Sequence, residues 1–448
     1  MASSSGWSSD LSGGADTIVA RATPGGRGAL AVIRVSGPRT PALALRVCPG
    51  LDFNSAWRAC LTTVHDPAGA PLEQAVAIPF PAPRSYTGED MLEVTVHGAP
   101  HLVEAVIAAF VSAGGRPAEP GEFTRRAVAN GKLDLIQAEA VGDLIAADTA
   151  WQLRLAREQL SGKLSKHFIE LRSDLVGLLA VLEASLDFEA QGAEVTEEEV
   201  VMQRDRCLSR LDGLLATAGA GERIRDGARV AILGPPNAGK STLFNHLCGS
   251  ERAIVSPHPG TTRDLLEAEL DLDGVRVLIQ DTAGLRVAGD DVEAEGRRRA
   301  LGAAASAAVV VLLWAADAPE GSPAPEASAG APLLRVRSKA DLAAGRERVD
   351  GWLPVSCRTG VGLAGFLGEL KELVCGEVAD LGGEVAIAAR HRRALEEARA
   401  ELVACDPTRP EEAVEAARSA QHKVSEMMGK IPSEEVLDEV FSTFCIGK

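Results

Sequence analysis

The residues best suited to chemistry form the run Gly234-Pro-Pro-Asn-Ala-Gly-Lys-Ser241, which fits the phosphate-binding pattern G-x-x-x-x-G-K-[ST]. An apolar run over 228–233 predicts a strand before it, and the residues from Thr242 predict a helix after it. Glycines let backbone N–H groups converge on phosphate oxygens at the positive end of that helix. Lys240 can reach the β- and γ-phosphates, and the Ser241 hydroxyl can ligate Mg²⁺. The alternative, a glycine-rich turn with a chance Lys-Ser, does not require this strand–loop–helix context.

Two later segments have the residues needed around a bound triphosphate. Gly260-Thr-Thr-Arg-Asp264 fits a switch loop, with Thr262 as a second hydroxyl on the Mg²⁺ side. Asp281-Thr-Ala-Gly284 ends a predicted strand, where Asp281 can hold Mg²⁺ through water and the Gly284 N–H can sense the γ-phosphate.

Two further segments fit the reading of a guanine base. In Ser338-Lys-Ala-Asp341, the Asp341 carboxylate can accept hydrogen bonds from N1–H and the 2-amino group together. Ser356-Cys-Arg358 lies where a backbone N–H would meet guanine O6. Two residues depart from the usual pattern. Ser338 replaces an Asn, so we expect weaker base affinity or weaker loop support. Leu285 stands where many GTPases carry a water-orienting Gln.

Composition narrows the class of protein. The 448 residues carry a net charge of −17, with 46% hydrophobic and 24% charged residues, which is typical of a soluble globular chain of two to four domains. Contact with a nucleic acid would need a local basic patch or a partner, because the overall field repels phosphate. The eight cysteines form no C-x-x-C pair, which argues against a zinc ribbon and favours reduced thiols.

The sequence shows no segment typical of targeting to another compartment. Its first fifteen residues are rich in Ser and Gly and resemble neither a signal peptide nor a transit peptide. The most apolar run, 303–316, is too short to span a membrane. We therefore expect a cytoplasmic protein without membrane contact.

Hydrophobic periodicity predicts the elements that position these residues. Short alternating runs at 29–35 and 91–96 predict strands of an α+β domain. Leucines from Leu153 to Leu186 recur mostly every three or four residues and predict one long amphipathic helix, after an earlier helix over 133–144. The acidic run 194–199 indicates a solvated face.

Strand–helix alternation returns after residue 223. Runs at 275–281, 307–313 and 333–336 predict buried parallel strands. The pattern is helical again after 376, so a nucleotide domain is inserted between two helical segments that pack as one bundle. The expected segments are 1–126 (α+β), 127–222 (helical), 223–375 (α/β, nucleotide-binding) and 376–448 (helical).

From residue 16 to 448 the chain resembles the MnmE (TrmE) family of tRNA-modifying GTPases. The terminal Phe444-Cys-Ile-Gly-Lys448 is the most specific segment when joined to the phosphate-binding loop, and Gly447 and Lys448 fit a prenylation box poorly. The other segments that carry the resemblance begin at Asp16 (DTIVARATPGGRG), Tyr86 (YTGED), Pro120 (PGEFTRRA), Asn130 (NGKLDLIQAEA), Gly260 (GTTRD) and Asp281 (DTAGLR).

This resemblance implies a fold and a function. The fold is an N-terminal α+β folate-binding and dimerisation domain, an α-helical bundle domain and an inserted Ras-like P-loop GTPase domain. The protein would be a homodimer that joins the FAD-dependent protein MnmG (GidA) in a heterotetramer or larger complex. Together they would add a carboxymethylaminomethyl-type group to C5 of the wobble uridine of certain tRNAs. The one-carbon unit would come from 5,10-methylene- or 5-formyl-tetrahydrofolate, and GTP with K⁺ would drive G-domain dimerisation and hydrolysis.

The resemblance also implies roles for individual residues. Asn237 matches a K⁺ ligand, and the loop 256–260, which carries unusual prolines, matches the K⁺ loop. Glu293 matches a glutamate that orients the attacking water; its alternative is an acid on a surface helix. The expected K⁺ ligands are Asn237, Ser256, His258 and Thr261, and the expected Mg²⁺ ligands are Ser241 and Thr262. The residues expected to contact GTP are Asn237, Ala238, Gly239, Lys240, Ser241, Thr242, Ser256, Thr261, Thr262, Asp281, Thr282, Ala283, Gly284, Ser338, Lys339, Asp341, Ser356, Cys357 and Arg358.

A second site is implied for folate. Its matching residues are Arg34, Glu93, Lys132 and Lys448, where a carboxylate would pair with the pterin N–H edge and cations would suit the glutamate tail. Cys445 would lie near the one-carbon unit, which makes it a candidate catalytic residue beside Glu293 and Lys240; the alternative is a buried, inert cysteine. Alone, each charged residue could equally form a surface salt bridge.

Two other functions remain open from the sequence. One is a regulatory GTP-binding switch acting on RNA or ribosome assembly, which would not need the folate residues. The other is a folate-dependent enzyme with a degenerate nucleotide domain, suggested by Ser338.

Overall fold

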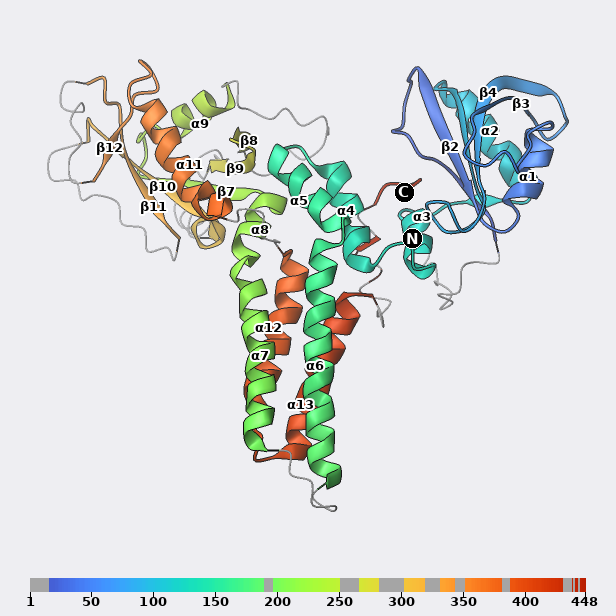
Figure 1. The fold of residues 1–448 in the computed structure, drawn as a ribbon. Helices are drawn as coiled ribbons and strands as arrows, with labels where there is room; N and C mark the ends of the chain where they lie inside the picture. The colour runs from blue at the N-terminus through green and yellow to red at the C-terminus, as the bar shows by residue number, and fades with distance from the viewer. Residues whose placement is uncertain are drawn as a thin grey trace, which may run out of the picture. The chain divides into compact units, whose positions relative to one another are not determined.

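A computed structural model of the chain forms two compact units (Figure 1). The first unit comprises Met1–Gly142, Gln159–Val176 and Arg418–Lys448, and the second comprises Asp143–Glu158 and Gly177–Ala417. The structure describes residues 16–188, 196–249, 266–281, 302–318, 331–342, 351–380, 387–429, 437, 440, 441 and 444–448.

The first unit contains a six-stranded sheet in the order β3-β4-β5-β2-β1-β6. All its neighbouring strands are antiparallel except β1 and β6. The strands expected over 29–35 and 91–96 are confirmed as β2 and β5. The bounds are β1 Ile18–Arg21, β2 Leu30–Ser36, β3 Cys60–His65, β4 Pro71–Phe80, β5 Met91–His97 and β6 Arg116–Pro117.

One face of this sheet packs against α1 (Thr40–Val47) and α2 (Pro100–Ser112). Alternate residues of the strands, such as Ile33 and Val94, join Phe110 of α2 in this core and are fully buried. Side chains alternate between the faces of a strand, so their chain neighbours point to the opposite face. That face carries polar residues of β2 and β5 and holds one of the two candidate sites.

The second unit contains a six-stranded sheet in the order β12-β11-β10-β7-β9-β8. Only β8 runs antiparallel to its neighbour; the pairs β9–β7, β7–β10, β10–β11 and β11–β12 are parallel. The strand expected over 228–233 and the parallel strands expected at 275–281, 307–313 and 333–336 are therefore confirmed, with shifts of up to two residues at their ends. The bounds are β7 Ala228–Leu233, β8 Leu266–Leu272, β9 Val275–Asp281, β10 Val309–Ala315, β11 Leu333–Ser338 and β12 Leu353–Pro354.

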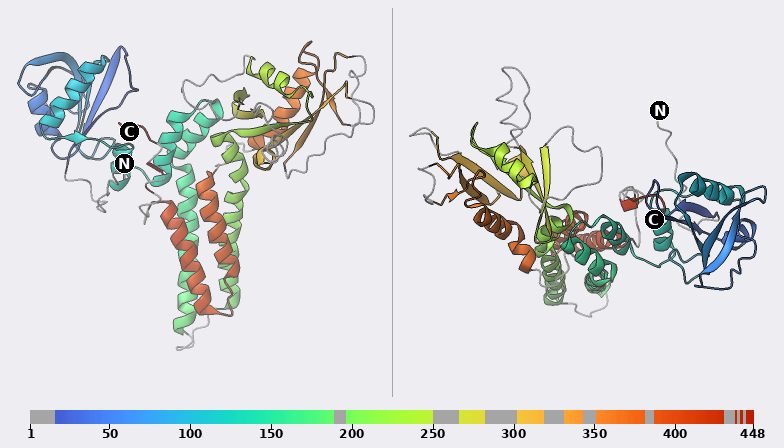
Figure 2. Two further views of the ribbon diagram at one scale, coloured as in Figure 1. Left: turned by 180° about the vertical axis from the view of Figure 1, so that it is seen from behind. Right: turned by 90° about the horizontal axis from the view of Figure 1, so that it is seen from above.

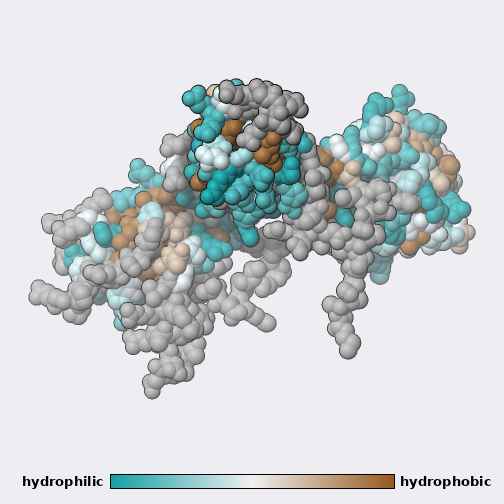
Figure 3. Space-filling model, turned by 90° about the horizontal axis from the view of Figure 1, so that it is seen from below, coloured by the Kyte–Doolittle hydropathy of each residue, from teal (hydrophilic) through white to brown (hydrophobic). Residues whose placement is uncertain are grey.

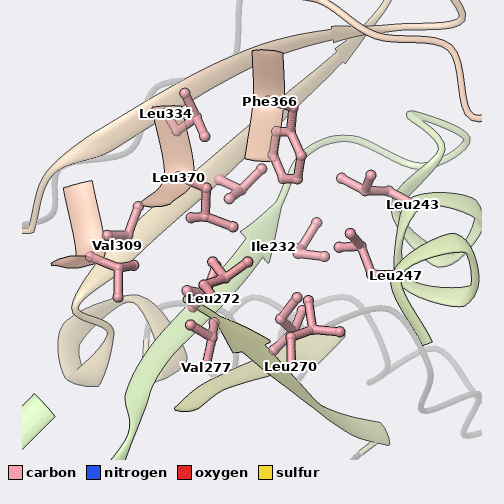
Figure 4. Close-up of a cluster of buried hydrophobic side chains, with 14 of the residues drawn as sticks. Ile232, Leu243, Leu247, Leu270, Leu272, Val277, Val309, Leu334, Phe366 and Leu370 are labelled. Atoms are coloured by element: carbon pink, nitrogen blue, oxygen red, sulfur yellow. The ribbon is translucent and has the colours of Figure 1, made fainter. Parts of the chain in front are cut away.

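The core of this sheet includes residues of three helices, α8 (Ala218–Asp226), α9 (Lys240–Cys248) and α11 (Leu363–Asp380). Figure 4 shows Leu243 and Leu247 of α9 and Phe366 of α11 directed toward Ile232 at the centre of the sheet. Burying each such side chain contributes about 1.5–3 kcal/mol. This packing holds the amino end of α9 against the end of β7, where the phosphate-binding loop lies.

The single long helix expected from Leu153 to Leu186 is wrong. Two helices occupy this segment, α5 (Ala150–Leu160) and α6 (Lys163–Phe188), and Gly162 between them has a φ of +81°. That conformation interrupts the helix, and glycine adopts it without steric cost. Leu153 is 44% exposed, so it does not continue the buried stripe of α6. The helix expected over 133–144 is confirmed as α4 (Leu135–Ala146).

The remaining helices include α7 (Glu197–Ala216) and α12 (Ala389–Ala404), which lie side by side in the second unit (Figure 2). Glu199 is exposed, as the solvated acidic run predicts, and it also forms a capping box with Thr196 at the start of α7. The segment boundaries expected at 126 and 375 fall inside α3 and α11. The other bounds are α3 Glu122–Ala129 and α13 Pro410–Met427.

The face drawn in Figure 3 is mainly hydrophilic among the described residues, with hydrophobic residues in small groups. Within the described ranges, no helix combines the length and apolar character needed to cross a bilayer.

Candidate functional site

The phosphate-binding loop begins where β7 ends. Gly234 has a φ of +148°, and a Cβ there would lie 2.5 Å from the backbone oxygen of Leu313 in β10, so only glycine fits. Asn237 and Gly239 also have positive φ values, of 61° and 88°. Lys240 begins α9 directly afterwards. A loop with such left-handed residues before a helix N-terminus presents successive N–H groups to an anion.

The side chain of Lys240 folds back over this loop. Its Nζ donates to the backbone oxygens of Gly234 and Pro235, both at 2.9 Å. These carbonyls hold the ammonium group at the loop, where a phosphate could bind it. Ser241 and Thr242 follow in the first turn of α9, at the edge of the loop. Both residues therefore lie at the end of the loop where α9 begins.

The residues expected to read a guanine base, Asp341 and Ser356, lie beyond β11 and β12. The Asp341 carboxylate accepts a hydrogen bond from Ser356 Oγ at 2.8 Å, and Arg358 lies 4.0 Å away. The bond from Ser356 is the main cause that lowers the pKa of Asp341, so the carboxylate stays ionised and can accept from a base. Lys339 has a φ of +59° and pairs with Asp317 at 2.8 Å, which links the residues after β11 to those after β10.

Ser338 supports the neighbouring loop even though it stands where an Asn was expected. Its Oγ donates to the backbone oxygen of Ala238 at 2.5 Å, and both residues are buried. The expected weakening of loop support is therefore offset by this bond, which joins the base loop to the phosphate loop. Cys357 beside Ser356 is half-buried, and burial raises the pKa of its thiol.

The topology brings these segments to one edge of the sheet. β7, β9, β11 and β12 are parallel, so the residues that follow them meet at the carboxyl ends of the strands. Ligands of open α/β sheets bind at this edge. Asp281 ends β9 there, although its side chain is outside the described residues. Ser256, His258, Thr261, Thr262, Thr282, Ala283, Gly284 and Glu293 also lie outside the described residues.

A second cluster lies on the polar face of the first unit's sheet. Arg34 and Glu93 are directly opposite each other on β2 and β5. Arg34 donates twice to Glu93 Oε1, from Nε at 3.0 Å and from Nη2 at 2.8 Å. Its guanidinium carbon lies 5.4 Å from the ring centre of Tyr86 and 5.6 Å from that of Phe123. The arginine of this partly buried pair therefore lies close to two aromatic rings.

The C-terminal segment completes this cluster. Arg34 Nη1 donates to the Gly447 oxygen at 3.3 Å, and the Phe123 N–H donates to the Lys448 oxygen at 3.2 Å. Gly447 has a φ of +97°, and a Cβ there would lie 2.1 Å from the Arg21 oxygen. Burial, and then the positive charge of Arg34, lowers the pKa of the Lys448 ammonium group. The structure thus brings Arg34, Glu93 and Lys448 together.

Lys132 and Cys445, which were also predicted for this site, form no bond to Arg34 or Glu93 among those described. Lys132 Nζ donates to the Pro83 oxygen at 3.1 Å. Cys445 is exposed, so the interpretation as a buried, inert thiol is wrong. Its backbone oxygen accepts from the Gly121 N–H at 3.5 Å, beside the Phe123 bond.

Sequence reasoning missed a partly buried ion network that supports α3. Arg126 is 7% exposed at its side chain and pairs with Glu122 at 2.9 Å, Asp16 at 2.7 Å and Glu89 at 3.3 Å. Arg116 binds Glu122 at 2.5 Å and also pairs with Asp16. Burial alone would raise the pKa of Glu122, but hydrogen bonds, chiefly from Arg116, outweigh it and lower that pKa.

The aromatic residues beside Arg34 were also missed. Tyr86 and Phe123 both fall in segments that carry the family resemblance, which was the available signal. Their contact with Arg34 joins the loop before β5, the start of α3 and the sheet, a pairing that periodicity alone cannot show.

Comparison with known proteins agrees with this geometry. Residues 17–132 match the family model described as the GTP-binding protein TrmE N-terminus, and residues 135–445 match that of the MnmE helical domain. The tRNA modification GTPase MnmE of a Thermus thermophilus strain is 42% identical over 97% of this chain and 99% of its own length. The protein of that name from Phenylobacterium zucineum is 43% identical over 97% of this chain and 100% of its own length.

Among solved structures, the G domain of T. maritima FeoB is 24% identical, covers 34% of this chain and 98% of its own, and has a TM-score of 0.24. The two family models together cover most of the chain, and the identity to curated relatives extends over nearly their whole length. This chain therefore belongs to the tRNA modification GTPase MnmE family.

Proposed function

We propose that the chain hydrolyses GTP at the loop edge of the second unit's sheet and couples this hydrolysis to tRNA modification. The observation that carries this is the bonded junction of three nucleotide-reading segments, in which Ser338 joins the phosphate loop and Ser356 holds Asp341. Family membership agrees with that chemistry.

The residues of the loop supply positioning and charge. N–H groups of the loop bind the phosphates, and Lys240 exchanges its two carbonyl partners for phosphate oxygens. Asp341 accepts from N1–H and the 2-amino group of guanine, which adenine cannot donate together. Because its pKa is lowered, Asp341 remains an acceptor throughout the neutral range.

Two cations fit the same site. The Ser241 hydroxyl in the first turn of α9 suits Mg²⁺, with Thr262 as its expected companion. Asn237, exposed and left-handed at the loop, suits K⁺ together with Ser256, His258 and Thr261. These ions neutralise charge that develops on the phosphates during hydrolysis. Glu293 is proposed to orient the attacking water.

The cluster around Arg34 is proposed to bind a tetrahydrofolate that carries a one-carbon unit, in the 5,10-methylene or 5-formyl form. Both Arg34 bonds fall on one oxygen of Glu93, so Oε2 is available to the N–H edge of a pterin. Tyr86 and Phe123 offer ring faces, and Lys448 and Lys132 offer cations for a glutamate tail. Cys445, exposed on the docked segment, is proposed to face the one-carbon unit.

Together these sites support a role at the wobble uridine. We propose that the chain acts as a cytoplasmic homodimer whose G domains associate when GTP and K⁺ bind. With MnmG, in a heterotetramer or larger complex, it would add a carboxymethylaminomethyl-type group at C5. The net charge of −17 favours a partner that contributes a basic surface for the tRNA.

Turnover and product analysis test this proposal separately. GTP turnover is expected to be faster in K⁺ than in Na⁺ buffer and to fall at least about a hundredfold in Lys240→Ala. Equal, negligible turnover in both buffers would refute the mechanism. Mass spectrometry of wobble nucleosides from cells that lack the gene is expected to show loss of the C5 group. Calorimetry with 5-formyl-tetrahydrofolate separates this enzyme from a regulatory switch, which would not bind it.

A further inference from the structure

The bond between Ser338 and Ala238 links the end of β11 to the phosphate loop. Ser338 Oγ lies 2.5 Å from the Ala238 oxygen, and Ser338 is 7% exposed. A Cβ placed on Gly239 would lie 3.6 Å from the same hydroxyl, so the two loops are in close contact here.

This bond fixes an amide of the phosphate loop. In a trans peptide, the C=O and N–H bonds lie in one plane and point in opposite directions. The carbonyl of Ala238 and the N–H of Gly239 belong to one such peptide. Because Ser338 holds the carbonyl, it also sets the direction of the Gly239 N–H. Gly239 has a φ of +88° and lies directly before α9, where such amides meet phosphate.

The same bond limits what Ser338 can offer to the base. A serine hydroxyl has one hydrogen to donate and two lone pairs. The carbonyl of Ala238 has no hydrogen, so Ser338 must be the donor, and its only hydrogen is used. Guanine N7 and O6 are acceptors. Ser338 therefore has no hydrogen left for either atom, whereas a carboxamide at this position would carry two.

We propose that Ser338 is a positioning residue that couples the base loop to the phosphate loop, and that residue 338 makes no hydrogen bond to N7 of the bound guanine. Base selectivity then depends on the donor edge of guanine, read by Asp341, which Ser356 holds at 2.8 Å. This inference rests on the proposed GTP site and adds a residue and an atomic specificity to it.

An analogue that lacks N7 tests the specificity. In 7-deaza-GTP a C–H replaces N7, and the N1–H and 2-amino donors are kept. The full-length native chain is expected to bind 7-deaza-GTP and GTP with dissociation constants within about threefold of each other. Ser338→Asn supplies spare donors and is expected to favour GTP over 7-deaza-GTP by roughly fivefold or more. Native discrimination of about tenfold or more, or none in Ser338→Asn, would overturn the assignment.

Removal of the hydroxyl tests the coupling. Ser338→Ala leaves the Ala238 carbonyl without this partner, and we expect GDP and GTP to bind about tenfold more weakly, with the ratio of GTP to 7-deaza-GTP unchanged. Ser338→Thr keeps the hydroxyl and is expected to restore binding. Circular dichroism verifies the fold of each variant. Native affinity in Ser338→Ala, or no recovery in Ser338→Thr, would refute the coupling.

The two proposals fail in different ways. If the native chain binds no guanine nucleotide, the GTP site itself is wrong. If it binds GTP through Lys240 but Ser338 variants and the analogue behave contrary to expectation, only the present inference is wrong.

Discussion

Replacing Gly447 with alanine should release the C-terminal segment from the first unit. In the docked segment Gly447 has a φ of +97°, and a Cβ would lie 2.1 Å from the Arg21 oxygen and 3.0 Å from Ala22 Cα. Both contacts are backbone atoms of β1 or of the residue after it, and Arg21 pairs with Ile33 in the sheet. They cannot move without disturbing the sheet, so the new methyl group has no room.

The free-energy cost of Gly447→Ala can be compared with the bonds that hold the C-terminal segment in place. The left-handed conformation alone costs alanine about 1–2 kcal/mol, before any steric overlap. Against this, the hydrogen bonds at Arg34, Phe123 and Gly121 contribute about 1 kcal/mol each at most. The strain and the overlap together exceed this gain, so the undocked segment should predominate. At about 1.4 kcal/mol per factor of ten, folate affinity should fall at least about tenfold.

Two assays measure the release of the C-terminal segment and its effect on folate binding. Hydrogen exchange at the Phe123 amide, which donates to the Lys448 oxygen, is expected to accelerate in Gly447→Ala. Calorimetry with 5-formyl-tetrahydrofolate reports the site, and GTP turnover in the second unit serves as an internal control. Gly376→Ala is the matched control variant, because a Cβ at that exposed helical position meets nothing within 4 Å. Native protection of Phe123 in Gly447→Ala would refute the reasoning.

Three further predictions concern stability and the phosphate loop. Arg126→Ala removes the arginine partner of the buried Glu89, while Arg116 still pairs with Glu122 and Asp16, and is expected to cost about 3 kcal/mol, or roughly 10 °C in the melting midpoint; the exposed Arg393→Ala is the control and should stay within about 0.5 kcal/mol. If calorimetry gives the same melting midpoint for both variants, the network around Arg126 contributes no more to stability than an exposed ion pair. Asp16 and Glu122 have lowered pKa values, so their contribution to stability is present above their unfolded pKa and is lost as pH falls; the melting midpoint should decline below about pH 4, and a flat profile from about pH 6 to 3 would contradict this. Gly234→Ala places a methyl group against the neighbouring strand and should abolish GDP binding in a fluorescent-nucleotide titration; retained affinity would show that this turn can adjust.

The sequence predicted most of the second unit because its information is local. A strand, a glycine loop and a helix adjacent in the chain identified 228–248, and β9, β10 and β11 each had an apolar run of their own, whereas β8 and β12 were not predicted. The helix break at Gly162 was missed because leucine spacing continues across it on both sides. Periodicity shows only how the apolar residues are spaced. A left-handed glycine can interrupt a helix without changing that spacing.

Contacts between distant segments could not be read from the pattern. The network around Arg126 also joins Asp16, Glu89 and Arg116, and apart from the i,i+4 pair of Glu122 and Arg126 nothing in the spacing marks these residues as neighbours. The pairing of Arg34 with Glu93 depends on the register of β2 and β5, which only the folded sheet fixes. The family resemblance identified these two residues, and the structure gives the physical reason, since they are opposite each other on one polar face.

The docked C-terminal segment has a consequence for the order of synthesis. Arg34 and Gly447 are bonded although 413 residues separate them. The sheet that carries Arg34 can fold as soon as it leaves the ribosome, yet the cluster around it stays incomplete until residues 445–448 have been translated. A nascent or truncated chain would therefore lack the hydrogen bonds at Gly447 and Lys448, and only polypeptides translated through Lys448 would complete this cluster.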